Sequence, residues 1–257
     1  MIIIEPTKNL TGITIQGDLE DLSNLVDSIY RLTTEDRFEN DPHYGVKLVL
    51  LSACYDIRHA SYGDREVALK ENVISNDVYR LHKIKGCNKN IYYSVNILFP
   101  TAIFLAASIP QLYLSSAGFY GKKSRRKNKP EYFPSFLYTD YIKDKANLDV
   151  LCAGIWQALG QVIGDDQLQE IIRLLEKTDE GYEDYNIHYI DRCIAELLVT
   201  DVEKRNKKLK NIARRLIVKA KEYYNLEDEY KYWAKHYNTT IYELSDPALK
   251  FSEEIEW

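Results

Sequence analysis

The sequence predicts an α+β fold in which a small antiparallel sheet of about four strands is packed with helices and followed by a helical bundle. Three observations support this. Strand-like alternation of apolar and polar residues ends before residue 100, apolar residues recur at helical spacing after residue 147, and a highly charged segment separates the two regions. We therefore divide the chain into an α+β unit at residues 1–120, a basic flexible loop at 121–137 and a helical unit at 138–257. The two units either share one core or fold separately.

Four segments are expected to form the sheet. Residues 2–5 and 12–16 form the first pair, joined by a turn, because the second segment alternates apolar and polar side chains. Residues 78–84 and 91–99 are predicted to form a hairpin around residues 85–90. The second arm of this hairpin alternates strictly from Ile91 to Phe99.

Two helices are predicted between these strands. Asp18 should cap a helix that ends near Thr33. A longer helix should follow, with Asp41 as its N-cap, Pro42 at its first position and Gly63 at its C-terminal stop. Bulky groups on both faces of this long helix indicate burial between two layers.

The rest of the chain is predicted to be helical. Pro100 opens an apolar helix that Pro110 should kink or end. Three apolar stripes follow within residues 148–162, 168–175 and 187–198. A fourth helix should begin at the capping box formed by Thr200 and Glu203.

Composition indicates an ordinary globular protein in the cytoplasm. Apolar residues make up 45% of the chain and charged residues 28%, and the formal net charge is -5. The four cysteines are widely spaced, and three of them occupy core-facing helical positions, which favours a reducing compartment. The start of the chain lacks the features of a secretion signal, and two prolines make residues 95–117 a poor membrane span. We expect no membrane association.

A polar cluster at the end of the long helix is the first candidate site. Tyr55, His59 and Tyr62 are spaced i, i+4 and i+7, and Arg58 borders them. Such a group could move a proton or position a phosphate, so Tyr55, Arg58 and His59 are candidate catalytic residues. The alternative is a structural network that satisfies its own polar groups where the helix meets the sheet.

Clustered positive charge is the second candidate. A helix at residues 204–221 and the loop at 122–129 together hold fifteen of the 34 Lys and Arg residues of this acidic chain. Such clusters can contact the phosphates of a nucleic acid or an acidic protein, although a solvated helix face and a solubilising loop would look the same. The candidate nucleic-acid-binding residues are Lys122, Lys123, Arg125, Arg126, Lys207, Lys208, Arg214 and Arg215.

No metal or cofactor is expected. The five histidines are scattered without zinc-ligand spacing, and neither a G-x-G-x-x-G motif nor a phosphate-binding P-loop is present.

Two short segments, residues 6–12 and 55–60, resemble an uncharacterised bacterial protein family over roughly the N-terminal half. The resemblance implies a bacterial or prophage origin and assigns no activity.

Three functions remain open, and the sequence does not decide whether the protein is an enzyme. The first is a non-catalytic binding protein for nucleic acid or an acidic partner. The second is a nuclease-like or phage-defence effector that uses Tyr55, Arg58 and His59. The third is a structural subunit of a homo-oligomer, with the aromatic tail as its interface.

Overall fold

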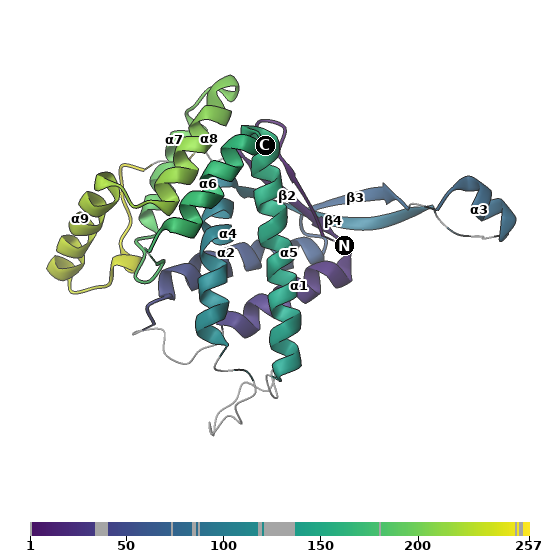
Figure 1. The fold of residues 1–257 in the computed structure, drawn as a ribbon, viewed down its shortest axis with the longest axis horizontal. Helices are drawn as coiled ribbons and strands as arrows, with labels where there is room; N and C mark the ends of the chain where they lie inside the picture. Colours follow the sequence, from purple (N-terminus) through teal and green to yellow (C-terminus); the bar gives the residue numbers. More distant parts are fainter. Residues whose placement is uncertain are drawn as a thin grey trace.

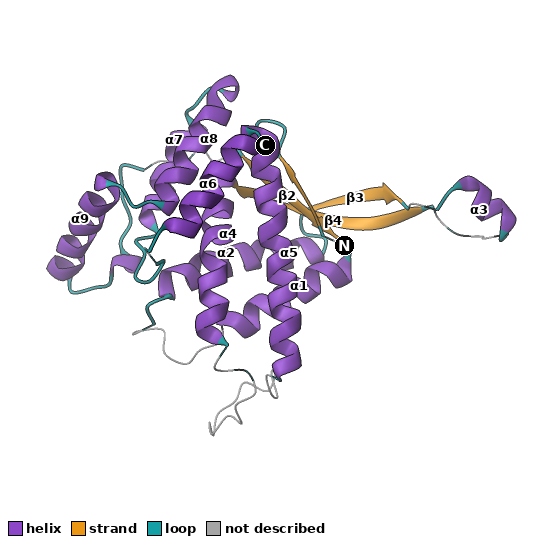
Figure 2. Ribbon diagram, in the orientation of Figure 1, coloured by secondary structure: helices purple, strands orange, loops and turns teal. Residues whose placement is uncertain are grey.

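The computed structural model confirms the α+β class. It describes residues 2–33, 41–72, 74–83, 86, 88–117, 120, 137–179, 181–249, 251 and 254–257. Four antiparallel strands form one sheet in the order β1-β2-β4-β3. Helices cover part of this sheet, and helices with their connecting loops make up the rest of the described chain (Figures 1 and 2). The strands are β1 (Ile3–Pro6), β2 (Gly12–Gly17), β3 (Glu66–Glu71) and β4 (Lys89–Leu98).

The N-terminal pair and the last strand are confirmed. β1 pairs with β2, and β2 pairs with β4 in a register that places Gly12 opposite Leu98. A Cβ atom at Gly12 would lie 2.2 Å from the carbonyl oxygen of Ile97, so this close approach requires glycine.

The third strand was predicted in the wrong place. β3 spans Glu66–Glu71, whereas the segment predicted as a strand at residues 78–84 begins within a short helix, α3 (Asn76–Leu81). Ser75 starts this helix, because its side chain accepts a hydrogen bond from the backbone N–H of Val78. Only two large apolar residues alternate in β3, and both are exposed, so no buried face distinguishes this strand in the sequence.

The first two helices are confirmed, with a shifted start for the second. They are α1 (Leu19–Thr33) and α2 (Tyr44–Ser61). Asp41 accepts a hydrogen bond from the N–H of His43, and His43 is the N-cap, so the helix begins two residues after the predicted Pro42. Gly63 ends it as expected with φ +83°, and its N–H donates to the carbonyl of Ala60.

The apolar helix α4 (Phe99–Ser116) continues through Pro110, so the prediction that Pro110 could end it is wrong. Thirteen of its residues are buried, and it packs against α2, α5, α7 and α8, which compensates for the missing amide hydrogen bond. Within the described ranges, no helix, α4 included, is long and apolar enough to cross a membrane.

The C-terminal half is helical, as predicted. It contains α5 (Tyr138–Ile163), α6 (Asp165–Lys177), α7 (His188–Leu198), α8 (Val202–Ile217), α9 (Lys221–Tyr237) and the 3-10 helix η2 (Ile241–Glu243). The predicted capping box is wrong. Asp201 is the N-cap of α8, and the Thr200 hydroxyl donates instead to the carbonyl oxygen of Glu196. Buried side chains from both halves belong to one hydrophobic cluster, in which α5 packs against α1, α4 and β1. The division into two units stays a prediction.

One part of the sheet projects away from the packed helices, which we call the body. β3, the outer half of β4 and α3 extend away from the packed helices, with α3 at the far end (Figure 1). We call this part the arm, which comprises residues 66–72, 74–83, 86 and 88–93 of the described chain. None of the residues of α3 is buried.

Candidate anion-binding site

Helix α8 presents its charged residues in an arc around an apolar face. Leu209, Ile212, Ala213 and Leu216 are fully buried against the core. At 3.6 residues per turn, the charged residues between them must therefore lie at the border of this face or on the solvent side. The structure divides the predicted basic cluster into three groups with different surroundings.

The first group holds the helix in place. Arg205 is 7% exposed, and its guanidinium donates to the carbonyl oxygens of Thr200 at 2.9 Å and Asn9 at 2.5 Å. Because Asn9 lies in the β1–β2 turn, Arg205 connects α8 to the sheet. This residue is structural and is not available to a ligand.

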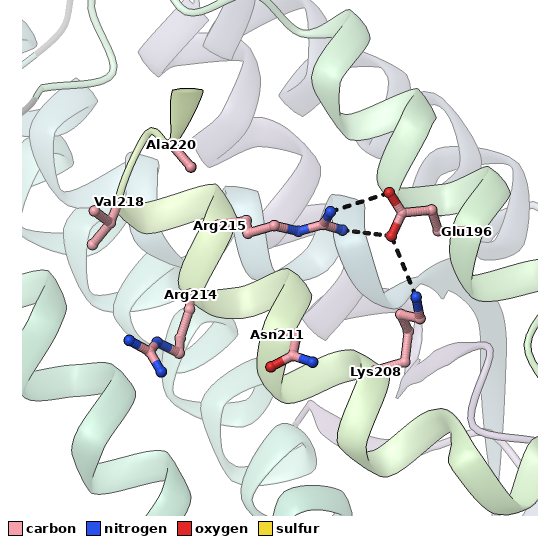
Figure 3. Close-up of a pocket in the computed structure, with 7 residues that line it drawn as sticks. All are labelled: Glu196, Lys208, Asn211, Arg214, Arg215, Val218 and Ala220. Atoms are coloured by element: carbon pink, nitrogen blue, oxygen red, sulfur yellow. Dashed lines mark hydrogen bonds and ion pairs between the residues drawn. The ribbon is translucent and has the colours of Figure 1, made fainter. Parts of the chain in front are cut away.

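The second group surrounds Glu196 of α7. Arg215 binds both carboxylate oxygens of Glu196, at 2.6 and 3.1 Å, and the Lys208 ammonium lies 3.5 Å from the same carboxylate (Figure 3). Arg215 also lies 3.4 Å from Glu222 at the start of α9. Partial burial favours the neutral acid, but the hydrogen bond and charge of Arg215, aided by Lys208, hold the pKa of Glu196 below its ordinary value.

The third group is open to solvent. Lys207, Asn211 and Arg214 are exposed and spaced i, i+4 and i+7, so they follow one side of α8. In the part of the chain that the structure describes, neither Lys207 nor Arg214 forms an ion pair with a carboxylate. Figure 3 shows Arg214 and Asn211 on the side of the helix away from Glu196. We call Lys207, Asn211 and Arg214 the open stripe.

A surface hollow of about 430 Å³ joins the second and third groups. Ala220, at its rim, is the N-cap of α9, and no side chain caps the first N–H groups of that helix. The positive end of the α9 dipole therefore adds to the positive charge around the hollow. We call this site the α8 hollow; it is lined by Glu196, Lys208, Asn211, Arg214, Arg215, Val218 and Ala220.

The hollow contains two polar residues that the sequence prediction missed, Asn211 and Glu196. Asn211 could have been found, because it lies four residues after Lys207 and three before Arg214 on a helix already identified. Glu196 belongs to another helix, and its position opposite Arg215 follows only from how α7 packs on α8.

The other cations of the region are accounted for differently. Lys204 pairs with Asp201 at 2.6 Å and Lys210 with Glu170 at 3.0 Å. The predicted loop residues lie outside the described residues; they are Lys122, Lys123, Arg125 and Arg126.

The predicted catalytic cluster forms at the end of α2. The Arg58 guanidinium donates to the Tyr30 hydroxyl at 2.8 Å and lies over the ring of Tyr55. The ring of Tyr55 stacks at a tilt on His59, whose Nδ1 is 2.9 Å from a carboxylate oxygen of Asp64. These contacts bring all three predicted residues together on the surface.

A second hollow, of about 390 Å³, lies near this cluster. Its lining includes Asp56 and Arg65, which pair at 2.9 Å, and Trp257 near the end of the chain. Tyr55, Arg58 and His59 are not among its lining residues. The cluster therefore has polar groups in contact, with Tyr55 exposed and Arg58 and His59 partly buried, and none of the three lines this hollow.

The three described cysteines are inert by environment. Cys54, Cys152 and Cys193 are buried and free, and burial raises the pKa of each thiol to about 12. Cys87 lies outside the described residues. Across the described ranges, no three His, Cys, Asp or Glu side chains are grouped so that they could hold a metal ion.

Comparison with curated proteins and with solved structures gives no match. A family model does match, and it spans residues 2–257. The match therefore extends well beyond the N-terminal half to which the sequence resemblance was limited. The chain belongs to the family described as Domain of unknown function (DUF6904).

Proposed function

We propose that this protein is a non-catalytic binding protein whose open stripe and α8 hollow contact the phosphate groups of a nucleic acid. One observation supports this most directly. Lys207, Asn211 and Arg214 lie on one exposed side of α8 without a carboxylate partner among the described residues, whereas the neighbouring cations of the helix are neutralised. Arg214 offers a planar set of donors and Asn211 an amide donor, a combination suited to phosphate oxygens.

The paired residues have a supporting role in this proposal. Glu196 holds Arg215 and Lys208 in a fixed arrangement, so these cations shape the hollow and retain only part of their charge for a ligand. The electrostatic contribution to binding therefore comes mainly from two open cations. In a plot of the logarithm of the binding constant against the logarithm of the salt concentration, each neutralised phosphate contributes slightly less than one to the negative slope. Two open cations therefore predict a slope of about -2.

The test is fluorescence anisotropy with labelled single-stranded RNA, single-stranded DNA and duplex DNA at several salt concentrations. The variant Lys207→Glu with Arg214→Glu should lose binding to all three probes, because it places negative charge along the whole stripe. Glu196→Gln should bind a few-fold more tightly and with a steeper salt slope, because it releases Arg215 and Lys208 from their shared partner.

A control with the same change in net charge comes from the same helix. Lys204→Glu with Lys210→Glu alters two cations that already pair with Asp201 and Glu170, so it should weaken binding much less than the stripe variant. Equal losses in both variants would mean that the net charge of the protein, and not this surface, controls binding. Binding to polyglutamate but to none of the nucleic acids would replace the proposal with an acidic protein partner.

The pair between His59 and Asp64 favours a second candidate, a nuclease-like effector. A histidine held by a carboxylate, with Tyr55 and Arg58 alongside, could transfer a proton to or from a phosphate ester. Cleavage of labelled RNA should then be lost in His59→Ala and reduced in Asp64→Asn, while circular dichroism shows a folded protein. An RNA that stays intact with the unmodified protein would reject this candidate.

A further inference from the structure

The arm exposes apolar side chains that a single chain does not cover. In the pairing of β3 with β4, Val67 lies opposite Tyr93 and Leu69 opposite Ile91, so these four side chains share one face of the ribbon. Val67 is 53% exposed, Leu69 61% and Ile91 53%. An isolated two-stranded ribbon is marginally stable in water, and grouped apolar side chains on a surface mark an interaction site.

The outer edge of β3 also offers backbone hydrogen-bonding groups. β3 is the last strand of the sheet, and Asn72, just beyond it, donates its N–H to the carbonyl of Asn88, just before β4. In an antiparallel pair, alternate residues bond to the neighbouring strand. Residues 66, 68, 70 and 72 therefore face β4, and Val67 and Leu69 direct their N–H and C=O groups away from the sheet.

The order of charges along this edge identifies its partner. Residues 65–71 read Arg-Glu-Val-Ala-Leu-Lys-Glu, a sequence in which charge changes sign on reflection through Ala68. We propose that β3 pairs antiparallel with β3 of a second copy of this chain, about a two-fold axis at Ala68. Glu66 then lies opposite the partner's Lys70, and Val67 opposite the partner's Leu69. Arg65, which also pairs with Asp56 of its own chain, lies opposite the partner's Glu71. Each of these pairs occurs twice.

Neighbouring registers lack this complementarity. Only shifts that place outward-facing residues opposite one another are allowed, so the next registers have their axis at Val67 or at Leu69. With the axis at Val67, Glu66 meets Ala68 and Arg65 meets Leu69. With the axis at Leu69, Glu71 meets Val67 and Lys70 meets Ala68. Each of these axes also places one apolar residue opposite its own copy, but within residues 65–71 only the register centred on Ala68 matches opposite charges. This register also joins Val67 to Leu69, and the apolar residues then continue as rows across all four arm strands.

In the same register, α3 at the tip of the arm can contact the end of the partner's α2, which adds to the area of the interface. Six residues at about 3.3 Å each and a sheet about 10 Å thick bury only ~200 Å² per copy, against ~800 Å² in a typical stable interface. Since Glu71 reaches the partner's Arg65, the chain beyond it lies beside the end of the partner's α2. Leu81 in α3 is 77% exposed, and Tyr62 at the end of α2 is 70% exposed, so this contact supplies apolar area that the strands alone lack.

The aromatic tail is less suited to be the interface. Its last residues pack on their own chain, since the carbonyl of Glu256 accepts a hydrogen bond from the Thr11 hydroxyl and the ring of Trp257 lies close to Gly12. The arm, in contrast, has its exposed apolar face and its free edge in one place. Self-association through β3 does not depend on whether α8 binds nucleic acid.

A charge exchange tests the register. Light scattering on a sizing column should show twice the mass of one chain for the unmodified protein, falling to one chain on dilution. Glu66→Lys and Lys70→Glu should each be monomeric, because either change places like charges opposite each other twice. The double variant Glu66→Lys with Lys70→Glu should dimerise again, and an equimolar mixture of the two single variants should form a mixed dimer.

Lys8→Glu, at an exposed position in the β1–β2 turn, is the matched control and should leave the dimer intact. Thermal unfolding followed by circular dichroism should show that both single variants keep their fold. A protein that stays monomeric up to millimolar concentration would overturn the proposal. A dimer that survives both single charge reversals, or that is lost in them and not restored in the double variant, would overturn it as well.

Discussion

The two halves of β4 share one apolar face and have opposite environments. Residues 94–98 lie under α2, and Val95 and Ile97 are 5% and 8% exposed. Residues 89–93 continue into the arm, where Ile91, two positions before Tyr93 on the same face, is 53% exposed. Alternation shows which face of a strand is apolar, but not what covers that face. In this protein the inner half is covered by its own helices, and we propose that the outer half is covered by a second copy.

The largest loss of stability is expected when a buried carboxylate in the body loses its cationic partner. Asp144 is buried, and it accepts hydrogen bonds from Arg31 at 2.7 Å and from the Tyr120 hydroxyl at 3.0 Å. Arg31→Ala leaves this carboxylate buried without its cation, so the free energy of unfolding should fall by about 3 kcal/mol. Urea unfolding measures this value, and Arg31→Ala with Asp144→Asn should recover part of the loss.

A surface pair provides the control for that experiment. Arg192 lies 3.6 Å from Glu229 and 3.7 Å from Asp246, and its side chain is 42% exposed. Arg192→Ala should therefore lower the free energy of unfolding by less than ~1 kcal/mol. Similar losses for Arg31→Ala and Arg192→Ala would show that enclosure of Asp144 does not matter to stability.

Shortening matched isoleucines at the two ends of β4 tests the comparison directly. Ile97 borders a small apolar space together with Leu50 and Ile57 of α2, so Ile97→Ala should lower the free energy of unfolding by about 3 kcal/mol. Ile91→Ala should cost less than ~1 kcal/mol in the monomer, because this side chain is half exposed. In the dimer, Ile91→Ala should instead weaken association, measured as a rise in the dissociation constant.

Hydrogen exchange should resolve the edge of the arm residue by residue. In a single chain, the amides of Ala68 and Lys70 bond to β4, whereas those of Val67 and Leu69 point outward. We expect the outward amides to exchange at least ten-fold faster than their neighbours in the monomeric variant Glu66→Lys. In concentrated unmodified protein all four should be protected, and the Lys8→Glu variant should behave in the same way. Unprotected Val67 and Leu69 amides in a dimer would place its interface elsewhere.

The elements that could be predicted are those whose own sequence contains the decisive signal. α1 has a capping aspartate and an apolar stripe, and α2 ends at a glycine that adopts positive φ. β3 lacked such a signal because its apolar residues are few, and the strand that pairs with β4 was therefore assigned to residues 78–84. Pro110 was misjudged for a different reason, since burial of α4 by several helices outweighs the local preference of one residue.

The candidate site was predictable in composition and not in arrangement. The sequence identified Lys207, Lys208, Arg214 and Arg215 as one cluster, and all four lie on α8. It could not separate the two cations that share Glu196 from the two that remain open, because that difference depends on how α7 and α9 pack beside α8. Charge counted along a sequence therefore overestimates the charge that a ligand meets.

The smallest expected effect on stability concerns Glu196, whose side chain is more exposed than Asp144 in the body and less exposed than Val67 and Leu69 in the arm. The folded state lowers the pKa of this carboxyl group because of Arg215 and Lys208, despite its partial burial. The ionised pair therefore stabilises the protein above the ordinary glutamate pKa, and that contribution is lost as the pH falls through the lowered value. Its side chain is 39% exposed, so solvent screening limits the contribution to about 0.5 kcal/mol.

Between about pH 5 and pH 3, Glu196→Gln should lose less stability than the unmodified protein by this amount. Urea unfolding at each pH measures the difference, with Glu170→Gln as the control for a more exposed pair with Lys210. If the two glutamine variants lose the same stability as the pH falls, the ion pairs of Glu196 with Arg215 and Lys208 are no stronger than an exposed surface pair. Neutralisation of Arg215 and Lys208 by Glu196 would then not explain why the open stripe provides the binding charge.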